Sequence, residues 1–207
     1  MDTAGSSSSI LDWACAGRPL HAGDESGDQQ VVVPVPQGVL LAVMDGLGHG
    51  PEAAAAAREA IRILAHDAIQ PALDLIRSCH EALRKTRGVV IALVRINSSD
   101  SMLEWCGVGN IEAALVRADL AAARRSASLV TSGGVVGYRY DSPRVSTLAI
   151  FPGDTLVLTT DGISAGFMNL VRVEDTPQII ADSILAGFAK TRDDALVLVA
   201  RYWGRAP

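Results

Sequence analysis

Apolar runs of strand length recur along the chain, separated by short turn-forming segments. Residues 39–44 are apolar at every position, and a Pro-Gln-Gly turn separates them from the apolar run 31–35, so we predict a β-hairpin buried on both faces. Similar runs predict further strands at 10–16, 89–96, 102–106, 111–117, 155–160 and 195–202, with shorter candidates near Leu129 and at 145–150. Because short turns join the strands between residues 89 and 117, we expect them to form an antiparallel meander.

Three segments carry helical patterns instead, at residues 51–65, 71–84 and 176–188. The first is alanine-rich and begins with Pro51, which suits the first turn of a helix because proline lacks a backbone N–H. Four side chains of the second helix share one face, Leu73, Ile76, His80 and Leu83. Strands in blocks with helices between them favour an α+β fold, with two packed antiparallel β-sheets flanked by helices.

Residues 10–207 are expected to form one domain, because no linker or repeat interrupts them. Residues 1–9 are serine-rich and predicted to be a disordered tail. They lack the basic and apolar regions of a signal peptide. No run of about 20 apolar residues occurs, which predicts that no segment spans a membrane. We therefore expect a cytoplasmic protein.

The composition excludes some further classes of function. Hydrophobic residues make up 49% of the 207-residue chain, which is ample for a core. The net charge of −5 argues against nucleic-acid binding, since phosphate backbones require concentrated Lys and Arg. Cys15, Cys79 and Cys106 are odd in number and have no CxxC spacing, so we expect buried, inert thiols rather than disulfides or a zinc site.

Aspartates stand beside the ends of the predicted strands. Asp45 and Asp161 each end an apolar run and precede a glycine, Asp193-Asp194 precede the last strand, and Asp28 precedes the run 31–35. Carboxylates at strand ends can converge on one rim of a sheet, and oxygen donors without cysteine suit Mg²⁺ or Mn²⁺. Two such ions can activate a water molecule for attack on a phosphoryl group.

Each of these acids also has a purely structural interpretation. Asp-Gly is a common turn dipeptide, Asp28 could be a solvated loop acid, and Asp193-Asp194 could cap a strand. Spacing alone therefore leaves both interpretations open. The order of the motifs changes this balance, because SGD at 26–28, VMDGLGHG at 43–50, TTDGI at 159–163 and DD at 193–194 occur in one chain.

Together these motifs resemble the metal-dependent protein phosphatase (PPM) family, in particular the bacterial branch that contains stage II sporulation protein E. The glycine-rich segments 107–110 and 132–137 match the same branch. The resemblance covers about residues 10–203 and implies an αββα four-layer sandwich with two divalent cations, Mn²⁺ or Mg²⁺. The implied substrate is phosphoserine or phosphothreonine on a partner protein.

Carried over residue by residue, the resemblance implies a role for each acid. Asp45 would bridge both ions, while the Gly46 carbonyl and Asp28 would help to hold the second. Asp161 and Asp193 would hold the first ion, and Asp45 and Asp161 would be the catalytic pair. The resemblance assigns supporting roles to three further residues, Asp194, His49 and Gly162.

The chain departs from the family pattern at several positions. Larger relatives carry a histidine suited to general-acid catalysis where this chain has Leu47, and His49 is expected to orient the loop or cap the following helix. Gln29 and Gln30 replace an acid found in many relatives, so we do not expect a third metal. Arg18 could contact substrate phosphate, although a plain surface role is favoured.

Sequence motifs that begin within the first thirty residues leave no room for a sensory domain before them. We therefore expect a small phosphatase that resets a phosphorylated stressosome or anti-sigma-factor protein, with a STAS-domain protein as partner. Selectivity is expected to come from the loop 24–28 and the stretch 133–143, with Tyr138, Arg139 and Tyr140. The alternatives are a catalytically silent binding module of the same fold, or a metallohydrolase of small phosphate esters.

Overall fold

The computed structural model of the protein describes residues 10–119, 121–122 and 125–204, so the predicted tail at 1–9 lies outside the described residues. Two helices follow the third strand and one precedes the last: α1 (Pro51–His66), α2 (Ala72–Leu83) and α3 (Pro177–Phe188). A short 3-10 helix, η1, covers Phe167–Leu170. The strands are β1 (Leu11–Arg18), β2 (Asp28–Val35), β3 (Gly38–Gly46), β4 (Val89–Asn97), β5 (Met102–Val108), β6 (Glu112–Val116), β7 (Ser126–Leu129), β8 (Gly134–Val135), β9 (Arg139–Tyr140), β10 (Ser146–Ala149), β11 (Thr155–Thr159) and β12 (Ala195–Tyr202).

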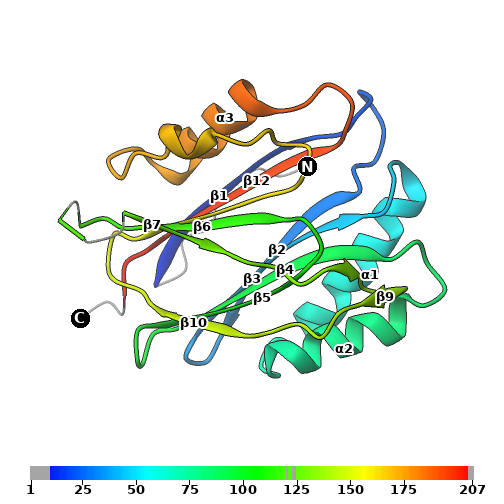
Figure 1. Ribbon diagram of the computed structural model, residues 1–207, viewed down its shortest axis with the longest axis horizontal. Coiled ribbons are helices and arrows are strands. Elements are labelled where there is room, and N and C mark those ends of the chain that lie inside the picture. Colours follow the sequence, from blue (N-terminus) through cyan, green and yellow to red (C-terminus); the bar gives the residue numbers. More distant parts are fainter. Residues whose placement is uncertain (1–9, 120, 123–124, 205–207) are drawn as a thin grey trace.

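The strands form two five-stranded antiparallel sheets and a small hairpin. One sheet has the order β1-β12-β11-β6-β7, the other β10-β5-β4-β3-β2, and β8 pairs with β9. Figure 1 shows α3 on one side of the paired sheets and α1 with α2 on the opposite side. The layers therefore run helix, sheet, sheet, helices, which confirms the predicted αββα sandwich.

Burial on both faces explains why long stretches of the central strands are apolar without alternation. In β3, Val39, Leu41 and Val43 face the core between the sheets, whereas Leu40 and Met44 face the core beneath α1 and α2. Strand β12 divides in the same way, since its residues alternate between the inter-sheet core and the core beneath α3. Successive side chains of a strand point to opposite faces, so a strand with both faces covered shows no alternation.

The predicted hairpin and helices form, with two corrections. Strand β2 pairs with β3 as expected, but it is an edge strand with most residues only half-buried, which also accommodates Pro34. In α2 the buried face consists of Ala72, Leu75, Ile76, Cys79 and Leu83. Leu73, which the sequence grouped on one face with Ile76 and Leu83, is 39% exposed and lies outside the buried face. The i, i+3, i+4, i+7 spacing of the observed face follows the helical period.

The predicted meander at 89–117 was wrong in its last strand. Strands β4 and β5 pair, but β6 leaves their sheet and pairs with β11 in the other one. Gly109 makes this crossing possible because its φ is +106°, and a Cβ there would lie 2.3 Å from the side chain of Val90. A chain that passes so close to a neighbour in a left-handed conformation needs glycine. The crossing then delivers Asn110 to the end of the sandwich.

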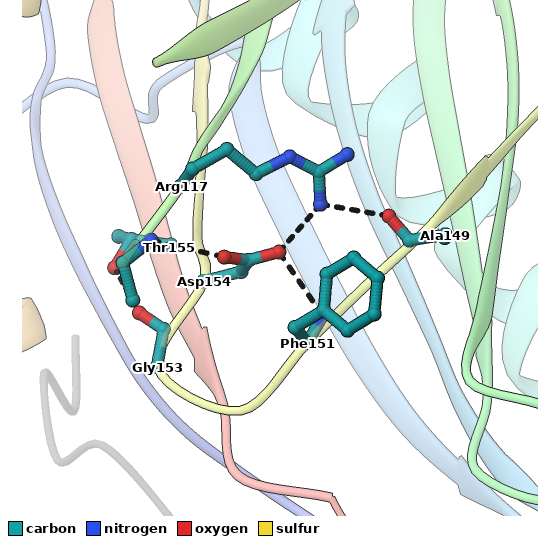
Figure 2. A network of polar contacts seen from close by, with 7 residues as sticks. Arg117, Ala149, Phe151, Gly153, Asp154 and Thr155 are labelled. Atoms are coloured by element: carbon teal, nitrogen blue, oxygen red, sulfur yellow. Dashed lines mark hydrogen bonds and ion pairs between the residues drawn. The ribbon is translucent and has the colours of Figure 1, made fainter. Parts of the chain in front are cut away.

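A buried ion pair joins the two sheets at the start of β11 (Figure 2). Arg117 donates hydrogen bonds to Asp154 (2.6 Å) and to the carbonyl of Ala149 at the end of β10 (2.8 Å). The second oxygen of Asp154 accepts the N–H of Ala118 (3.0 Å), and the Arg117 guanidinium lies 5.6 Å from the ring centre of Phe151. Because both carboxylate oxygens are satisfied, this charge is tolerated in the interior. It anchors the opposite end of β11 from Asp161.

No helix within the described ranges is both long and apolar enough to cross a bilayer.

Candidate metal centre

Four segments bring five aspartates to one end of the two sheets. Asp45 lies near the end of β3, and Asp28 begins β2 directly opposite it in the register. In the other sheet, Asp161 follows β11, and Asp193 and Asp194 precede its neighbour β12. Antiparallel pairing places the end of one strand beside the start of the next, so each sheet contributes one cluster of acids to the same end.

The clustered carboxylates repel one another. Burial, followed by the charge of Asp45, raises the pKa of Asp28 far above the usual aspartate range, and a hydrogen bond from Thr160 only partly opposes the rise. Burial and the charges of Asp161 and Asp193 raise the pKa of Asp45. Asp193 is less buried, and burial followed by the charge of Asp161 raises its pKa as well. Ionising the whole set is therefore unfavourable unless a cation compensates the charge.

A cleft of about 680 Å³ opens onto three of these acids, Asp45, Asp161 and Asp193. Its other lining residues are Leu47, Gly48, His49, Val90, Gly109, Asn110, Gly133, Gly134, Val135 and Arg192. Asp28 is reached from the other side, through a separate cavity of about 430 Å³ between β1 and β2 that Arg18 also lines. Of these two cavities, the cleft is lined by both Asp45 and Asp161, so a substrate there can reach the two together.

Neutral side chains hold two of the acids in place. The Thr160 hydroxyl donates to Asp28 Oδ2 at 2.6 Å, and the Asn110 amide donates to Asp161 Oδ2 at 2.8 Å. Each contact leaves part of the carboxylate available while fixing its orientation. Hydrogen bonds of this kind around a ligand set usually tune metal affinity.

Asp193 and Asp194 are adjacent in sequence but have different surroundings. Asp194 is 3% exposed, and its two oxygens accept the backbone N–H groups of Leu20 and Gly27, both at 2.6 Å. It therefore fastens the loop that leads into Asp28. Asp193 is half-buried and lines the cleft beside Asp161. This division favours Asp193 as the direct ligand and Asp194 as a structural support.

The glycines that follow Asp45 and Asp161 are needed for close packing. A Cβ on Gly46 would lie 2.2 Å from the carbonyl oxygen of Ala53 in α1, and a Cβ on Gly162 would lie 1.7 Å from that of Asp194. Both contacts are too short for any side chain. Neither glycine has a positive φ. Steric exclusion by a neighbouring backbone therefore explains them better than the turn propensity of an Asp-Gly dipeptide.

His49 does not cap the helix that follows it. The N-cap of α1 is Gly50, whose φ of 77° suits glycine, and no side chain makes the capping hydrogen bond. That half of the sequence hypothesis was wrong. The His49 ring instead meets His21 edge-on, with ring centres 6.3 Å apart. This contact joins the loop after β3 to the loop after β1 and is consistent with a loop-orienting role.

The donor chemistry of the cluster fits Mg²⁺ or Mn²⁺, which prefer oxygen ligands. Its geometry is not that of a finished site, since no three Asp, Glu, His or Cys side chains in the described part of the chain lie close enough together to hold a metal. Ionised carboxylates repel one another, so we expect a bound cation to draw these side chains together.

The structure adds four functional candidates that the sequence did not single out: Thr160, Asn110, Lys190 and Arg192. Thr160 and Asn110 lie inside motifs that matched the family pattern, yet only their positions in the fold reveal which acid each contacts. The Lys190 ammonium donates to the backbone carbonyl of Asp161 at 2.5 Å. No local pattern marks the two cationic residues, so they become recognisable only beside the cleft.

The sandwich is that of the PP2C-type phosphatase domains. A chain from a structure of the bacterial stressosome, described as a modular system adapted to control secondary messenger signalling, superposes with a TM-score of 0.84 at 29% identity, covering 92% of this chain and 99% of that one. RsbX in complex with magnesium superposes with a TM-score of 0.85 at 17% identity, covering 96% of this chain and 98% of that one.

The sequence assigns the chain more narrowly. Residues 36–203 match the stage II sporulation protein E (SpoIIE) family, and the chain therefore belongs to that family, as its motifs predicted. The phosphoserine phosphatase RsbX of Bacillus subtilis (strain 168) is 29% identical over 76 residues, which are 35% of this chain and 37% of RsbX. The match thus spans little more than a third of that relative's length.

Proposed function

We propose that this chain is a metal-dependent protein serine/threonine phosphatase. The observation that carries the proposal is the meeting of Asp28, Asp45, Asp161 and Asp193 at one end of the sandwich in a member of the SpoIIE family. These carboxylates raise the free energy of the folded chain when they ionise, so they do not serve stability. A functional role for them as metal ligands explains why the fold carries this cost.

The positions of the acids support a role for each in this proposal. Asp45 would contact both of two Mg²⁺ or Mn²⁺ ions. Asp161 and Asp193 would hold the first ion, while Asp28 and the Gly46 carbonyl would hold the second. Bound ions of this kind activate water as a nucleophile and neutralise charge on the phosphate.

The hydrogen bonds behind these ligands then keep each carboxylate in one orientation. Asn110 binds one oxygen of Asp161, and Thr160 binds one oxygen of Asp28. Asp194 holds the loop that carries Asp28 in register with β3. Second contacts of this type are worth roughly tenfold to a hundredfold in metal affinity.

The proposed substrate is phosphoserine or phosphothreonine on a folded signalling protein, in a role like that of RsbX. Support comes from the phosphoserine phosphatase activity named for RsbX and from the stressosome setting of a structural neighbour. A STAS-domain protein is the predicted partner, within a stressosome or anti-sigma-factor system. In this proposal such substrates are recognised by surface around the cleft, because four glycines in the cleft lining offer no side chains to contact them.

The hairpin β8–β9 supplies a surface for such recognition. Tyr138 at its turn is 83% exposed and Arg139 is exposed, whereas Tyr140 packs edge-on against His80 with ring centres 4.9 Å apart. The His80 ring nitrogen also accepts the N–H of Gly137 at 3.1 Å. Tyr140 thus anchors the hairpin, while Tyr138 and Arg139 are free to contact a partner, as interface hot spots often do.

Paired substrates test this recognition. Tyr138→Ala and Arg139→Ala are expected to lower kcat/KM on a phosphorylated STAS-domain protein by roughly tenfold, since each removes a contact worth about 1–2 kcal/mol. Turnover of p-nitrophenyl phosphate should not change. Trp203→Ala, which removes another half-exposed aromatic side chain at the end of β12, is the matched control. Equal values of kcat/KM on the phosphoprotein and its excised phosphopeptide would contradict recognition of a folded partner.

The activity itself is tested with purified protein on p-nitrophenyl phosphate and on a phosphoprotein. Turnover should require Mn²⁺ or Mg²⁺ and stop when EDTA is added. In Asp45→Asn, turnover should fall by about a thousandfold or more, because a metal ligand is lost. Full turnover in metal-free buffer would contradict the mechanism. No turnover by the wild type with either ion would favour a silent binding module, and a strong preference for small phosphate esters would favour a metabolic hydrolase.

A further inference from the structure

The cleft contains an arginine, Arg192, directly before Asp193. Its exposed side chain lines the cleft together with Asp45, Asp161 and Asp193. Within residues 10–119, 121–122 and 125–204, its guanidinium has no hydrogen bond or ion pair, and no other Lys or Arg lines the cleft. A guanidinium that stands beside three carboxylates without pairing to any of them keeps all its donors available.

Other cationic side chains near the acids are already engaged. The Lys190 ammonium donates to the Asp161 carbonyl, and the Arg18 guanidinium donates to the carbonyl of Lys190. Arg87 lies against the loop after β3, but it forms an ion pair with Glu52. Among the residues that the structure describes, the cleft arginine is therefore the cation that remains free to meet a ligand there.

An anionic ligand needs such a group in this cleft. A phosphate monoester carries up to two negative charges at neutral pH, and the surrounding carboxylates repel it. The planar guanidinium offers two parallel N–H donors that match two phosphate oxygens. The Arg192 side chain can thus bind phosphate without occupying the place of any of the carboxylates.

We propose that Arg192 binds the phosphate group of the substrate and positions it at the acid cluster. The identity of the substrate rests on the proposed function, whereas binding of a free phosphate ion does not. This assignment replaces Arg18, which the sequence offered as a phosphate contact. Arg18 lines the cavity between β1 and β2, and its guanidinium already donates to a backbone carbonyl.

The test compares Arg192→Gln and Arg192→Lys with the wild type. Binding of inorganic phosphate is measured by isothermal titration calorimetry in Mg²⁺, and KM and kcat are measured with p-nitrophenyl phosphate. Arg192→Gln should weaken phosphate binding and raise KM by roughly tenfold to a hundredfold, the usual effect of losing hydrogen bonds from a charged donor. Arg192→Lys should show a smaller loss of phosphate affinity and a smaller rise in KM, because lysine keeps the positive charge although it lacks the two parallel N–H donors.

Two controls separate positioning from structure. Arg84→Gln, at the end of α2 where Arg84 pairs with Glu81, should match the wild type in every measurement. The Tm of Arg192→Gln should equal that of the wild type, since the side chain is exposed and unpaired. A larger loss in kcat than in KM, or equal losses in Arg192→Gln and Arg192→Lys, would overturn a phosphate-binding role.

The two proposals fail in different ways. If the wild type binds phosphate through Arg192 but hydrolyses nothing, the proposed activity fails and the phosphate site stands. If Arg192→Gln binds phosphate as tightly as the wild type, or the wild type binds none, the inference about Arg192 is overturned even in an active phosphatase.

Discussion

The hydroxyl of Thr160 donates a 2.6 Å hydrogen bond to the carboxylate of Asp28. Asp28 begins β2 in one sheet, and Thr160 directly follows β11 of the other sheet. The same hydroxyl accepts the backbone N–H of Leu196 at 2.9 Å, so it is fixed from behind by β12. Asp28 is 6% exposed and would otherwise lack a donor from the other sheet. This contact therefore sets the distance between the Asp28–Asp45 pair and the acids that flank β11 and β12.

Replacing Thr160 should separate stability from metal binding. Thr160→Val removes both hydrogen bonds and should lower the stability of the folded chain by about 1–3 kcal/mol, because the Leu196 N–H loses its acceptor. The affinity for Mg²⁺ should fall by roughly tenfold or more. Calorimetric titration with Mg²⁺ and thermal melts provide the measurements. Thr160→Ser keeps the hydroxyl and should retain both stability and Mg²⁺ affinity. If Thr160→Ser lost as much of either as Thr160→Val, the methyl group rather than the hydroxyl would be responsible.

Asp193→Ala and Asp194→Ala should have opposite consequences. Asp194→Ala leaves the Leu20 and Gly27 N–H groups without their acceptor, at about 1–3 kcal/mol each, and should lower the Tm of metal-free protein by several degrees. Asp193→Ala relieves repulsion, so the metal-free Tm should hold or rise while the stabilisation by Mg²⁺ disappears. Equal melting behaviour of the two variants would refute the division of roles between these neighbours.

The stability of metal-free protein should fall as pH rises. Burial and the neighbouring carboxylates raise the pKa of Asp45 to about 7, while an unfolded aspartate titrates near about 3.9. Between these values the folded chain holds a proton that the unfolded chain has lost, so the stability present below about pH 4 is lost progressively up to about pH 7. Each pKa unit corresponds to about 1.4 kcal/mol, which predicts a drop of several degrees in Tm.

Thermal melts in EDTA across this pH range check the expectation. Mg²⁺ should raise the Tm most at the high end, where the acids are ionised, and Asp45→Asn should flatten the pH dependence. A Tm that rises with pH in EDTA would mean that these acids are favourably paired in the folded chain.

The cysteines should be irrelevant to turnover. Burial raises the pKa of Cys15 and Cys79 to about 12 and that of Cys106 to about 11, so reactive thiolate is scarce at neutral pH. Native protein treated with iodoacetamide should keep its activity and its unmodified mass, while protein unfolded in guanidinium should be alkylated at all three positions. Loss of activity in step with a single alkylation would assign the enzyme to a cysteine-dependent class.

Local patterns were sufficient wherever a residue's surroundings follow from its neighbours in sequence. The apolar runs of β3 and β12 and the alanine-rich start of α1 each indicate their own element, because burial on both faces and helix propensity act over a few residues. The acids could be picked out for the same reason, since each stands beside a strand end.

The hairpin β8–β9 was missed because its strands have two residues each and depend on remote contacts. Val136 is fully buried and exchanges backbone hydrogen bonds with Val89, both at 2.9 Å, and Gly137 bonds to His80 on α2. A segment held by such contacts has no period of its own. The sequence could therefore name the stretch 133–143 as a recognition surface, but not the hairpin that holds it in place.

The sequence by itself determined the sandwich of strands and helices, the SpoIIE family and the set of acids, because those depend on local apolar periodicity and on short motifs. Only the tertiary structure decided that β6 crosses to the other sheet, that Asp194 binds backbone while Asp193 faces the cleft, and that Arg192 lines that cleft together with three carboxylates. Those features depend on which distant segments meet. Neighbouring positions with the same chemistry, such as two adjacent aspartates, receive different roles only when the chain has folded around them.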